Sequence, residues 1–252
     1  MNSILKEALS FLKRTIYGIL SYTLFKQGIT KTINRVKIKF PFAYSRYYPS
    51  DYEPFKQKFI ENYAHGLAVD LGAHIGLYTV LLSQKATQVI AFEPTKFTRK
   101  VLSETLKFNG CQNVTVRSEM VTDASGSGTF YETESKVSNA NSLVPLGTPH
   151  LVSTIALDDL NIVIDFLKVD IEGAELLVLR GAGRTLSTLK YMTLEIHPRL
   201  MARLGQAVIE IFELLKPYEP IYFMEDKLVT IEQLVKIEDH FEINVILNGA
   251  MK

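Results

Sequence analysis

The chain has 252 residues, of which 47% are hydrophobic and 22% charged, the proportions of a globular protein with one sizeable core and an extension. A single cysteine, Cys111, excludes an internal disulfide framework and a cysteine-based zinc cluster, and it weakly favours a reducing compartment. The net charge of +1 is unevenly spread, because residues 1–60 hold 11 Lys and Arg against 3 Asp and Glu. We therefore expect a basic extension, residues 1–62, on an acidic domain, residues 63–252.

The start of the chain contains an amphipathic helix pattern. From Ile4 to about Phe25, apolar residues recur at helical spacing and basic residues flank the apolar face. The longest uncharged run, residues 15–25, has 11 residues, whereas a bilayer span needs about 20, and no small-residue cleavage site follows it. We therefore expect neither a transmembrane helix nor a secretory signal. Packing of the helix onto the domain or onto a second copy of the chain is favoured. The alternative is contact with an anionic membrane through residues 1–28.

The rest of the chain predicts an α/β domain. Residues 30–63 are basic and then rich in tyrosine and proline, which indicates one or two strands and a turn-rich connection. Its aromatic side chains either cap the sheet, the commoner outcome, or line a substrate entrance. From Gly66 onward strands and helices alternate, which predicts a mostly parallel sheet with helices on both faces. A polar segment, residues 132–150, is expected to be a functional or mobile loop. The predicted strands are 67–71, 89–92, 114–118, 166–169, 192–196, 221–224 and 241–247.

A glycine loop follows the first strand of the domain. The pattern Asp-x-Gly-x-x-x-Gly is formed by Asp70, Gly72 and Gly76, and the next strand ends on Glu93. Glycines let the backbone approach a ligand where a Cβ would clash, and a carboxylate at that strand end accepts hydrogen bonds from ribose hydroxyls. Dinucleotide sites have a further glycine for the pyrophosphate, whereas the acid here suits a ligand with ammonium and sulfonium groups. The pattern favours S-adenosylmethionine, and the alternative is a turn without a ligand.

Other polar residues are expected at the same edge of the sheet. Ligands of such sheets bind outside the carboxyl ends of the strands, where Glu119, Asp170 and His197 also fall. Methyl transfer from a sulfonium needs alignment of acceptor, methyl and sulfur, and a hydroxyl acceptor also needs a base. Lys168 lies inside a buried strand and is expected to need a carboxylate partner.

The candidate catalytic residues are Asp170, Glu172 and His197. Asp170 is expected to orient the methionine amine of the cofactor or to act as the base. Glu172 has either a catalytic role or, as is favoured for Glu175, a structural role near a helix N-terminus. His197 is poised to take up a proton near neutral pH, although a hydrogen-bonded structural role is commoner for a histidine at a strand end. A divalent ion on Asp170, Glu195 and His197 is conceivable, but their spacing carries no metal signature and no metal is predicted.

Taken together, these motifs resemble FkbM-type methyltransferases, a family of S-adenosylmethionine-dependent enzymes with the class I, Rossmann-like fold. The resemblance covers about residues 66–200 and implies a mostly parallel, seven-stranded sheet. It also implies that the glycine loop and Glu93 hold the cofactor, and that Glu119 and Met120 approach its adenine. The segments that carry the resemblance are 69–76, 91–94, 154–160, 168–175 and 195–198, and the loop residues are Asp70, Gly72, Ala73, His74 and Gly76.

The family is associated mainly with O-methylation of hydroxyls on natural products and sugars. We therefore expect a cytoplasmic or membrane-peripheral O-methyltransferase acting on a small molecule, a glycan or a lipid-linked glycan. The alternatives are an RNA methyltransferase anchored by the basic extension, a non-catalytic scaffold that binds the cofactor as a partner subunit and, least favoured, a dehydrogenase. The acidic domain argues against nucleic acid. Assembly into a homo-oligomer is left open.

Overall fold

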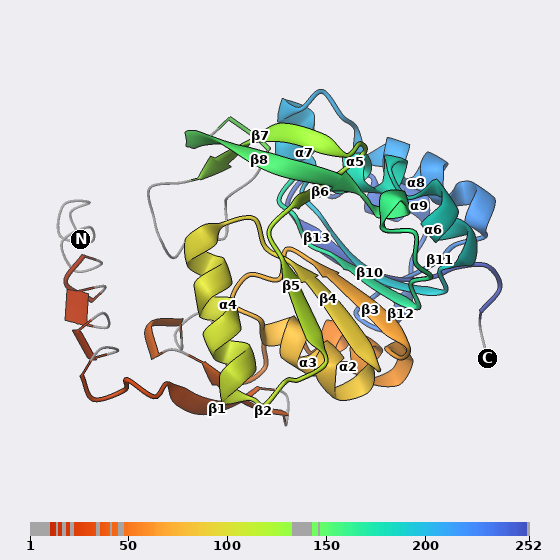
Figure 1. The fold of residues 1–252 in the computed structure, drawn as a ribbon. Helices are drawn as coiled ribbons and strands as arrows, with labels where there is room; N and C mark the ends of the chain where they lie inside the picture. The colour runs from red at the N-terminus through yellow and green to blue at the C-terminus, as the bar shows by residue number, and fades with distance from the viewer. Residues whose placement is uncertain are drawn as a thin grey trace, which may run out of the picture.

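The computed structural model describes residues 11–13, 15–16, 19–20, 23–33, 36–40, 42–44, 48–132, 143–145 and 147–250. Its centre is an eight-stranded sheet in the order β12-β11-β13-β10-β9-β3-β4-β5 (Figure 1). The five strands from β10 to β5 run parallel, and β13 pairs antiparallel with both β10 and β11. The strands are β3 (Leu67–Leu71), β4 (Gln88–Phe92), β5 (Val114–Arg117), β9 (Phe166–Val169), β10 (Tyr191–Ile196), β11 (Ile221–Met224), β12 (Lys227–Leu228) and β13 (Phe241–Ile246).

The predicted fold class is confirmed, with one more strand in the sheet than expected. The additional strand is β12, which has two residues and pairs with the end of β11 at the sheet edge. A pattern of alternating residues cannot be recognised over two positions, so this strand has no signal in the sequence.

Helices cover both faces of the sheet. On one face lie α2 (Pro54–Tyr63), α3 (Leu77–Lys85) and α4 (Lys96–Phe108), whose apolar side chains form one buried cluster (Figure 1). The other face carries a second buried cluster, formed with five shorter helices. These helices are α5 (Glu175–Arg180), α6 (Gly183–Thr188), α7 (Pro198–Arg203), α8 (Val208–Leu215) and α9 (Ile231–Leu234). Elsewhere in the chain, 3-10 turns are formed by Phe42–Tyr44, Leu157–Leu160 and Lys216–Tyr218.

Strand pleating decides which side chains enter which cluster. In β3, Ala68 packs into the cluster of α2–α4, whereas Val69 and Leu71 pack into the other. Successive side chains point to opposite faces of a strand, so Asp70 shares the face of Ala68. Its partner across the parallel pair with β9 is Lys168. Two charged side chains thus lie opposite each other inside the sheet.

Part of the expected basic extension belongs to the domain. A hairpin of β1 (Ile29–Ile33) and β2 (Val36–Phe40) places Ile33 and Ile38 in the core that α3 and α4 build. The boundary expected at residues 62 and 63 falls inside α2, whose Ile60 is buried in the same core. Only a turn-rich connection was expected where α2 lies, because its helical pattern is short and follows a run of tyrosines and prolines.

The N-terminal helix behaves differently from this hairpin. Residues 11–13, 15–16 and 19–20 are helical, and there Phe11 is 68% and Ile19 59% exposed. The packing onto the domain that the sequence favoured is therefore not seen in the described part of this helix. Among the described residues no helix combines the length and the apolar character needed to cross a bilayer.

A second, three-stranded sheet of β6 (Met120–Thr122), β8 (Thr148–Ala156) and β7 (Gly126–Glu132) lies beside the main sheet (Figure 1). The loop expected at 132–150 is therefore shorter at both ends, and residues 133–142 lie outside the described part. β8 contains Pro149, and at this position β8 pairs only with β7, because β6 pairs with β8 from Thr154 onward. Proline is tolerated where one side of a strand has no partner.

Candidate active site

A cavity of about 230 Å³ opens at the carboxyl ends of the parallel strands, where ligands of such sheets bind. Of the predicted cofactor residues, Gly72, Ala73, His74, Glu93, Glu119, Met120 and Asp170 line it. Of the predicted catalytic residues, Asp170 and Glu172 line it, and His197 lies next to Glu172. Most of the residues predicted from the sequence therefore lie at or next to this cavity.

The glycine loop after β3 is shaped by close contact with β9. Gly72 has a φ of 73°, and a Cβ there would lie 1.8 Å from the carbonyl oxygen of Asp170. Only glycine fits this position, because it combines left-handed backbone with backbone-to-backbone approach. The amides of Gly72 and Ala73 donate to the carbonyl oxygen of Phe92 at 3.1 and 3.0 Å, which ties the loop to the end of β4.

Asp70 and Gly76, which were also predicted to bind the cofactor, do not line the cavity. The carboxylate of Asp70 is fully buried and lies 3.0 Å from the Lys168 ammonium, and it accepts a 2.6 Å hydrogen bond from the Thr79 hydroxyl. Lys168 also donates to the carbonyl of Gly72 at 3.2 Å. The carboxylate partner expected for Lys168 is thus Asp70. The pair also stabilises the glycine loop, because Lys168 contacts both Asp70 and the Gly72 carbonyl. Gly76, with a φ of 94°, is the N-cap of α3.

Glu93 ends β4 with its carboxylate at the cavity wall. One oxygen accepts the His74 amide at 3.0 Å and the other accepts the Thr95 amide at 2.9 Å. A carboxylate has about four acceptor positions, so acceptor capacity remains for hydroxyl donors in the cavity. Burial raises the pKa of Glu93 to about 7, against the opposing effect of these amide donors. The Glu93 side chain therefore fits the ribose-binding role that the sequence suggested.

Part of the cavity lining is apolar. Met120, Val121 and Phe130 line it, and they come from β6 and β7. Glu119 also lines it and is paired with Arg117, which lowers the pKa of Glu119 through that hydrogen bond. An apolar wall with a few polar groups is the usual lining of a site for a flat ring such as adenine.

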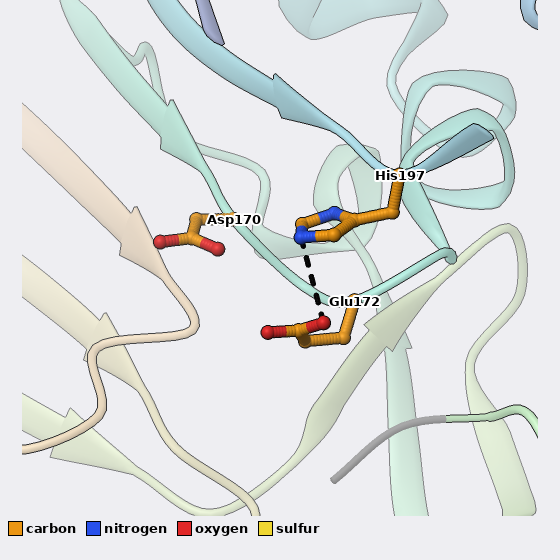
Figure 2. Close-up of side chains that lie close together, drawn as sticks. All are labelled: Asp170, Glu172 and His197. Atoms are coloured by element: carbon orange, nitrogen blue, oxygen red, sulfur yellow. Dashed lines mark ion pairs between the residues drawn. The ribbon is translucent and has the colours of Figure 1, made fainter. Parts of the chain in front are cut away.

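The three predicted catalytic residues lie close together (Figure 2). Asp170 follows β9, Glu172 lies two residues on with a left-handed φ of 54°, and His197 follows β10. The imidazole Nε2 of His197 lies 3.4 Å from Glu172 Oε2. Its other nitrogen, Nδ1, lies 2.7 Å from Glu175 Oε1, so Glu175 has the structural role that was favoured for it and orients the ring.

The electrostatics favour Glu172 over His197 as the proton acceptor. Burial lowers the pKa of His197, but the hydrogen bond to Glu175 and the neighbouring carboxylates outweigh it and raise the pKa to about 9. Burial, together with the other acids, raises the pKa of Glu172 to about 7. For Asp170, the charges of Lys168 and Lys56 outweigh burial and lower the pKa. His197 is thus a cation at neutral pH in this arrangement, which argues against the base role considered for it.

The sequence analysis missed a second cluster beside the cavity. The fully buried Lys56 ammonium of α2 lies 2.6 Å from Glu53, 2.7 Å from Glu242 and 3.3 Å from Glu195. The only signal in the sequence was the spacing of Glu53 and Lys56, which is too common to be diagnostic. Several tyrosines that were expected mainly to cap the sheet line the cavity instead, namely Tyr48 and Tyr52, together with Tyr78 of α3.

The solved structures to which the fold of this chain is similar include methyltransferases of low sequence identity. An rRNA methylase from Streptococcus thermophilus aligns with a TM-score of 0.48 and 12% identity, covering 77% of this chain and 94% of that one. A putative methyltransferase from Streptococcus mutans, solved with S-adenosylhomocysteine, gives 0.46 and 12%, covering 77% and 96%. A precorrin-6y C5,15-methyltransferase from Geobacter metallireducens gives 0.44 and 13%, covering 79% and 90%.

A search among curated proteins gave no match. The sequence profile of the methyltransferase FkbM domain, in contrast, matches residues 70–222, which is more than half of the chain and includes the loop, Glu93 and the Asp170 segment. The cavity fits the cofactor of such enzymes, because it joins a carboxylate with free acceptor positions to an apolar wall. The chain therefore belongs to the FkbM methyltransferase family, whose cofactor is S-adenosylmethionine.

Proposed function

We propose that the chain is an O-methyltransferase that acts on a hydroxyl of a small molecule, a glycan or a lipid-linked glycan. The observation that carries the proposal is the convergence of Asp170 and Glu172, which line the cavity, with His197 beside them. A hydroxyl must lose a proton as it is methylated, whereas a neutral amine already has a free electron pair. Carboxylates at the acceptor end therefore favour a hydroxyl.

S-adenosylmethionine, when bound, supplies a methyl group on a positively charged sulfur that leaves as a neutral thioether. A hydroxyl oxygen of the acceptor would take up this methyl group, and the electron pair of the broken carbon–sulfur bond would remain on sulfur. A carboxylate of Asp170 or Glu172 takes the hydroxyl proton. Glu93 and the loop at Gly72 and Ala73 hold the donor in place, and this alignment is worth up to about 7–11 kcal/mol of the barrier.

The same carboxylates favour an acceptor that is not an anion. Asp170, Glu172 and Glu195 all line the cavity, so a phosphate brought to this end would be repelled. This arrangement supports a neutral or cationic acceptor over RNA. The basic residues of the N-terminal segment remain a proposed contact for an anionic surface outside the cavity, and the exposed Phe11 and Ile19 suit that contact.

The first test is calorimetric titration with S-adenosylhomocysteine, with NAD as the control ligand. We expect micromolar binding of the first and none of the second. The Glu93→Gln variant should weaken binding, and Glu104→Gln, which changes an exposed residue of α4, should not. Transfer of a labelled methyl group to a panel of hydroxylated glycans and lipids, with the product analysed by mass spectrometry, then tests the acceptor class. Normal cofactor binding with methylation of amines alone would contradict the O-methyl assignment.

A further inference from the structure

The side chains of Asp170, Glu172 and His197 have the composition and the spacing of a metal-ligand set. One potential ligand atom from each lies within 4.8 Å of those of the other two. Figure 2 shows the Nε2 edge of the imidazole turned toward the Glu172 carboxylate, with the Asp170 carboxylate beside them. Two carboxylates and one imidazole are ligands used for divalent ions such as Mn²⁺ and Mg²⁺.

The two nitrogens of His197 have different surroundings. The Nδ1 atom lies 2.7 Å from Glu175, which is the length of a charge-assisted hydrogen bond. The Nε2 atom lies 3.4 Å from Glu172 Oε2 and 3.7 Å from Glu195 Oε1, beyond that length. Ligands about 2.1 Å from one ion and at right angles to each other are about 3 Å apart, so the Nε2 side has the spacing of atoms that share an ion.

Glu175 supplies an independent observation. Its side chain is fully buried, and Oε1 accepts hydrogen bonds from the Gly173 amide and from His197 Nδ1. Its Oε2 is buried and has no hydrogen-bond partner among the described residues. A carboxylate behind the imidazole keeps a proton on Nδ1, so an ion that displaces the Nε2 proton meets the lone pair of that nitrogen, and metal-binding histidines almost always have such a partner.

The neighbouring carboxylates of Glu53, Glu195 and Glu242 have a similar spacing, but they surround a lysine side chain. There the Lys56 ammonium lies within 3.3 Å of all three carboxylates. That group already surrounds a cation of the chain itself. It therefore serves as an internal control for the group around His197.

We propose that Asp170, Glu172 and His197 bind one divalent cation of the Mn²⁺ or Mg²⁺ type at the acceptor end of the cavity. The role of the ion rests on the proposed function: a hydroxyl bound to it is held in place and loses its proton more readily. Each carboxylate offers one oxygen to the ion, and its second oxygen remains to take that proton. Binding of the ion itself does not depend on the identity of the acceptor.

The test is titration of the full chain with Mn²⁺. Binding is measured as the loss of the aqueous Mn²⁺ signal in electron paramagnetic resonance. We expect one Mn²⁺ per chain with micromolar affinity, and competition by Mg²⁺. Glu172→Gln and His197→Gln should weaken binding at least tenfold, and Glu175→Gln by about tenfold, the scale of an outer-shell change. The matched control is Glu242→Gln, which should change the affinity less than twofold. Pulsed measurements should detect nitrogen coupling from an imidazole, and His197→Gln should remove it.

Mn²⁺ binding in the millimolar range that Glu172→Gln leaves unchanged would overturn the proposal. Equal losses of Mn²⁺ affinity in Glu172→Gln and Glu242→Gln would overturn it too, as would the lack of nitrogen coupling. Thermal melting confirms that each variant is folded. If His197→Gln does not fold, the pair Glu172→Gln and Glu242→Gln decides. S-adenosylhomocysteine is titrated in parallel in metal-free buffer. Cofactor binding without Mn²⁺ binding overturns only the ion, whereas Mn²⁺ binding without cofactor binding overturns the proposed function and not the ion.

Discussion

Two carboxylate clusters at adjacent ends of the central strands differ in what neutralises them. In the first, Glu195 and Glu242 are direct cross-strand partners, and such a pair of like charges is destabilising unless a cation lies between them. Lys56 of α2 supplies that cation and is itself fully buried. In the second, Asp170 and Glu172 face an open cavity beside the imidazole of His197.

This difference teaches which acids are structural and which are available for chemistry. Acids that hold a lysine of the same chain join α2 to the sheet, whereas acids at the cavity wall keep acceptor positions for a ligand. Glu195 belongs to both clusters, since one of its oxygens lies 3.3 Å from Lys56 and the other 3.7 Å from His197. It therefore links the structural cluster to the candidate site.

The largest expected effect is a loss of turnover in variants of the cavity cluster and not of the Lys56 cluster. Glu172→Gln should lower turnover about 10²–10⁴-fold, the usual contribution of a group that handles a proton. Asp170→Asn should likewise lower turnover more than cofactor affinity. Glu242 does not line the cavity and pairs with Lys56, so Glu242→Gln should leave turnover nearly unchanged. Steady-state rates with a labelled methyl donor measure this, and comparable losses in the Glu172 and Glu242 variants would contradict the division.

The reverse experiment addresses stability. Lys56→Met leaves three acids around a buried apolar side chain and should lower the free energy of unfolding by about 3–5 kcal/mol, as for other broken buried ion pairs. Lys58→Met on the same helix removes an ammonium that is 60% exposed and paired with Asp226, so its effect should stay below about 1 kcal/mol. Urea denaturation of both variants gives the comparison. Equal stabilities would remove Lys56 as the link between α2 and the sheet.

Glu93 lines the cavity and is predicted to bind the cofactor. Its replacement should have an effect on cofactor affinity that is smaller than the effects expected for Glu172 and Lys56. Glu93→Ala should weaken S-adenosylhomocysteine binding by about 1–3 kcal/mol, because the ribose hydroxyls and the amides of His74 and Thr95 lose an acceptor. Calorimetric titration measures the change. Unchanged affinity in a folded variant would exclude Glu93 from the cofactor site.

The smallest effect is a pH dependence of cofactor affinity. Ribose hydroxyls bind the ionised form of Glu93, whose pKa burial raises to about 7 against the His74 and Thr95 amides and the charge of Arg99. Affinity should therefore be constant above pH 7 and fall by up to about tenfold per pH unit below it, since one pKa unit corresponds to 1.36 kcal/mol. Titrations from pH 5.5 to 8.5 measure this, and Glu93→Gln should abolish the dependence. A variant that retains the same slope would assign it to another group.

The amino-acid sequence by itself determined the edge of the sheet at which the site lies. Strands that run parallel end at one edge, so Gly72, Glu93, Asp170 and His197 could be placed together from strand positions and spacing alone. The glycine loop needed no tertiary information either, because its pattern depends on local backbone freedom.

Only the tertiary structure decided what each acid does there. Asp70 and Asp170 both lie at strand ends, but the register of β3 and β9 sets Asp70 opposite Lys168 inside the sheet, while Asp170 reaches the cavity. Lys56 approaches Glu195 and Glu242 from a helix far away in the sequence. Charge–charge interactions depend on distance and burial, and packing of distant segments sets both. Strand patterns alone therefore do not distinguish a neutralised acid from one that is available to a ligand.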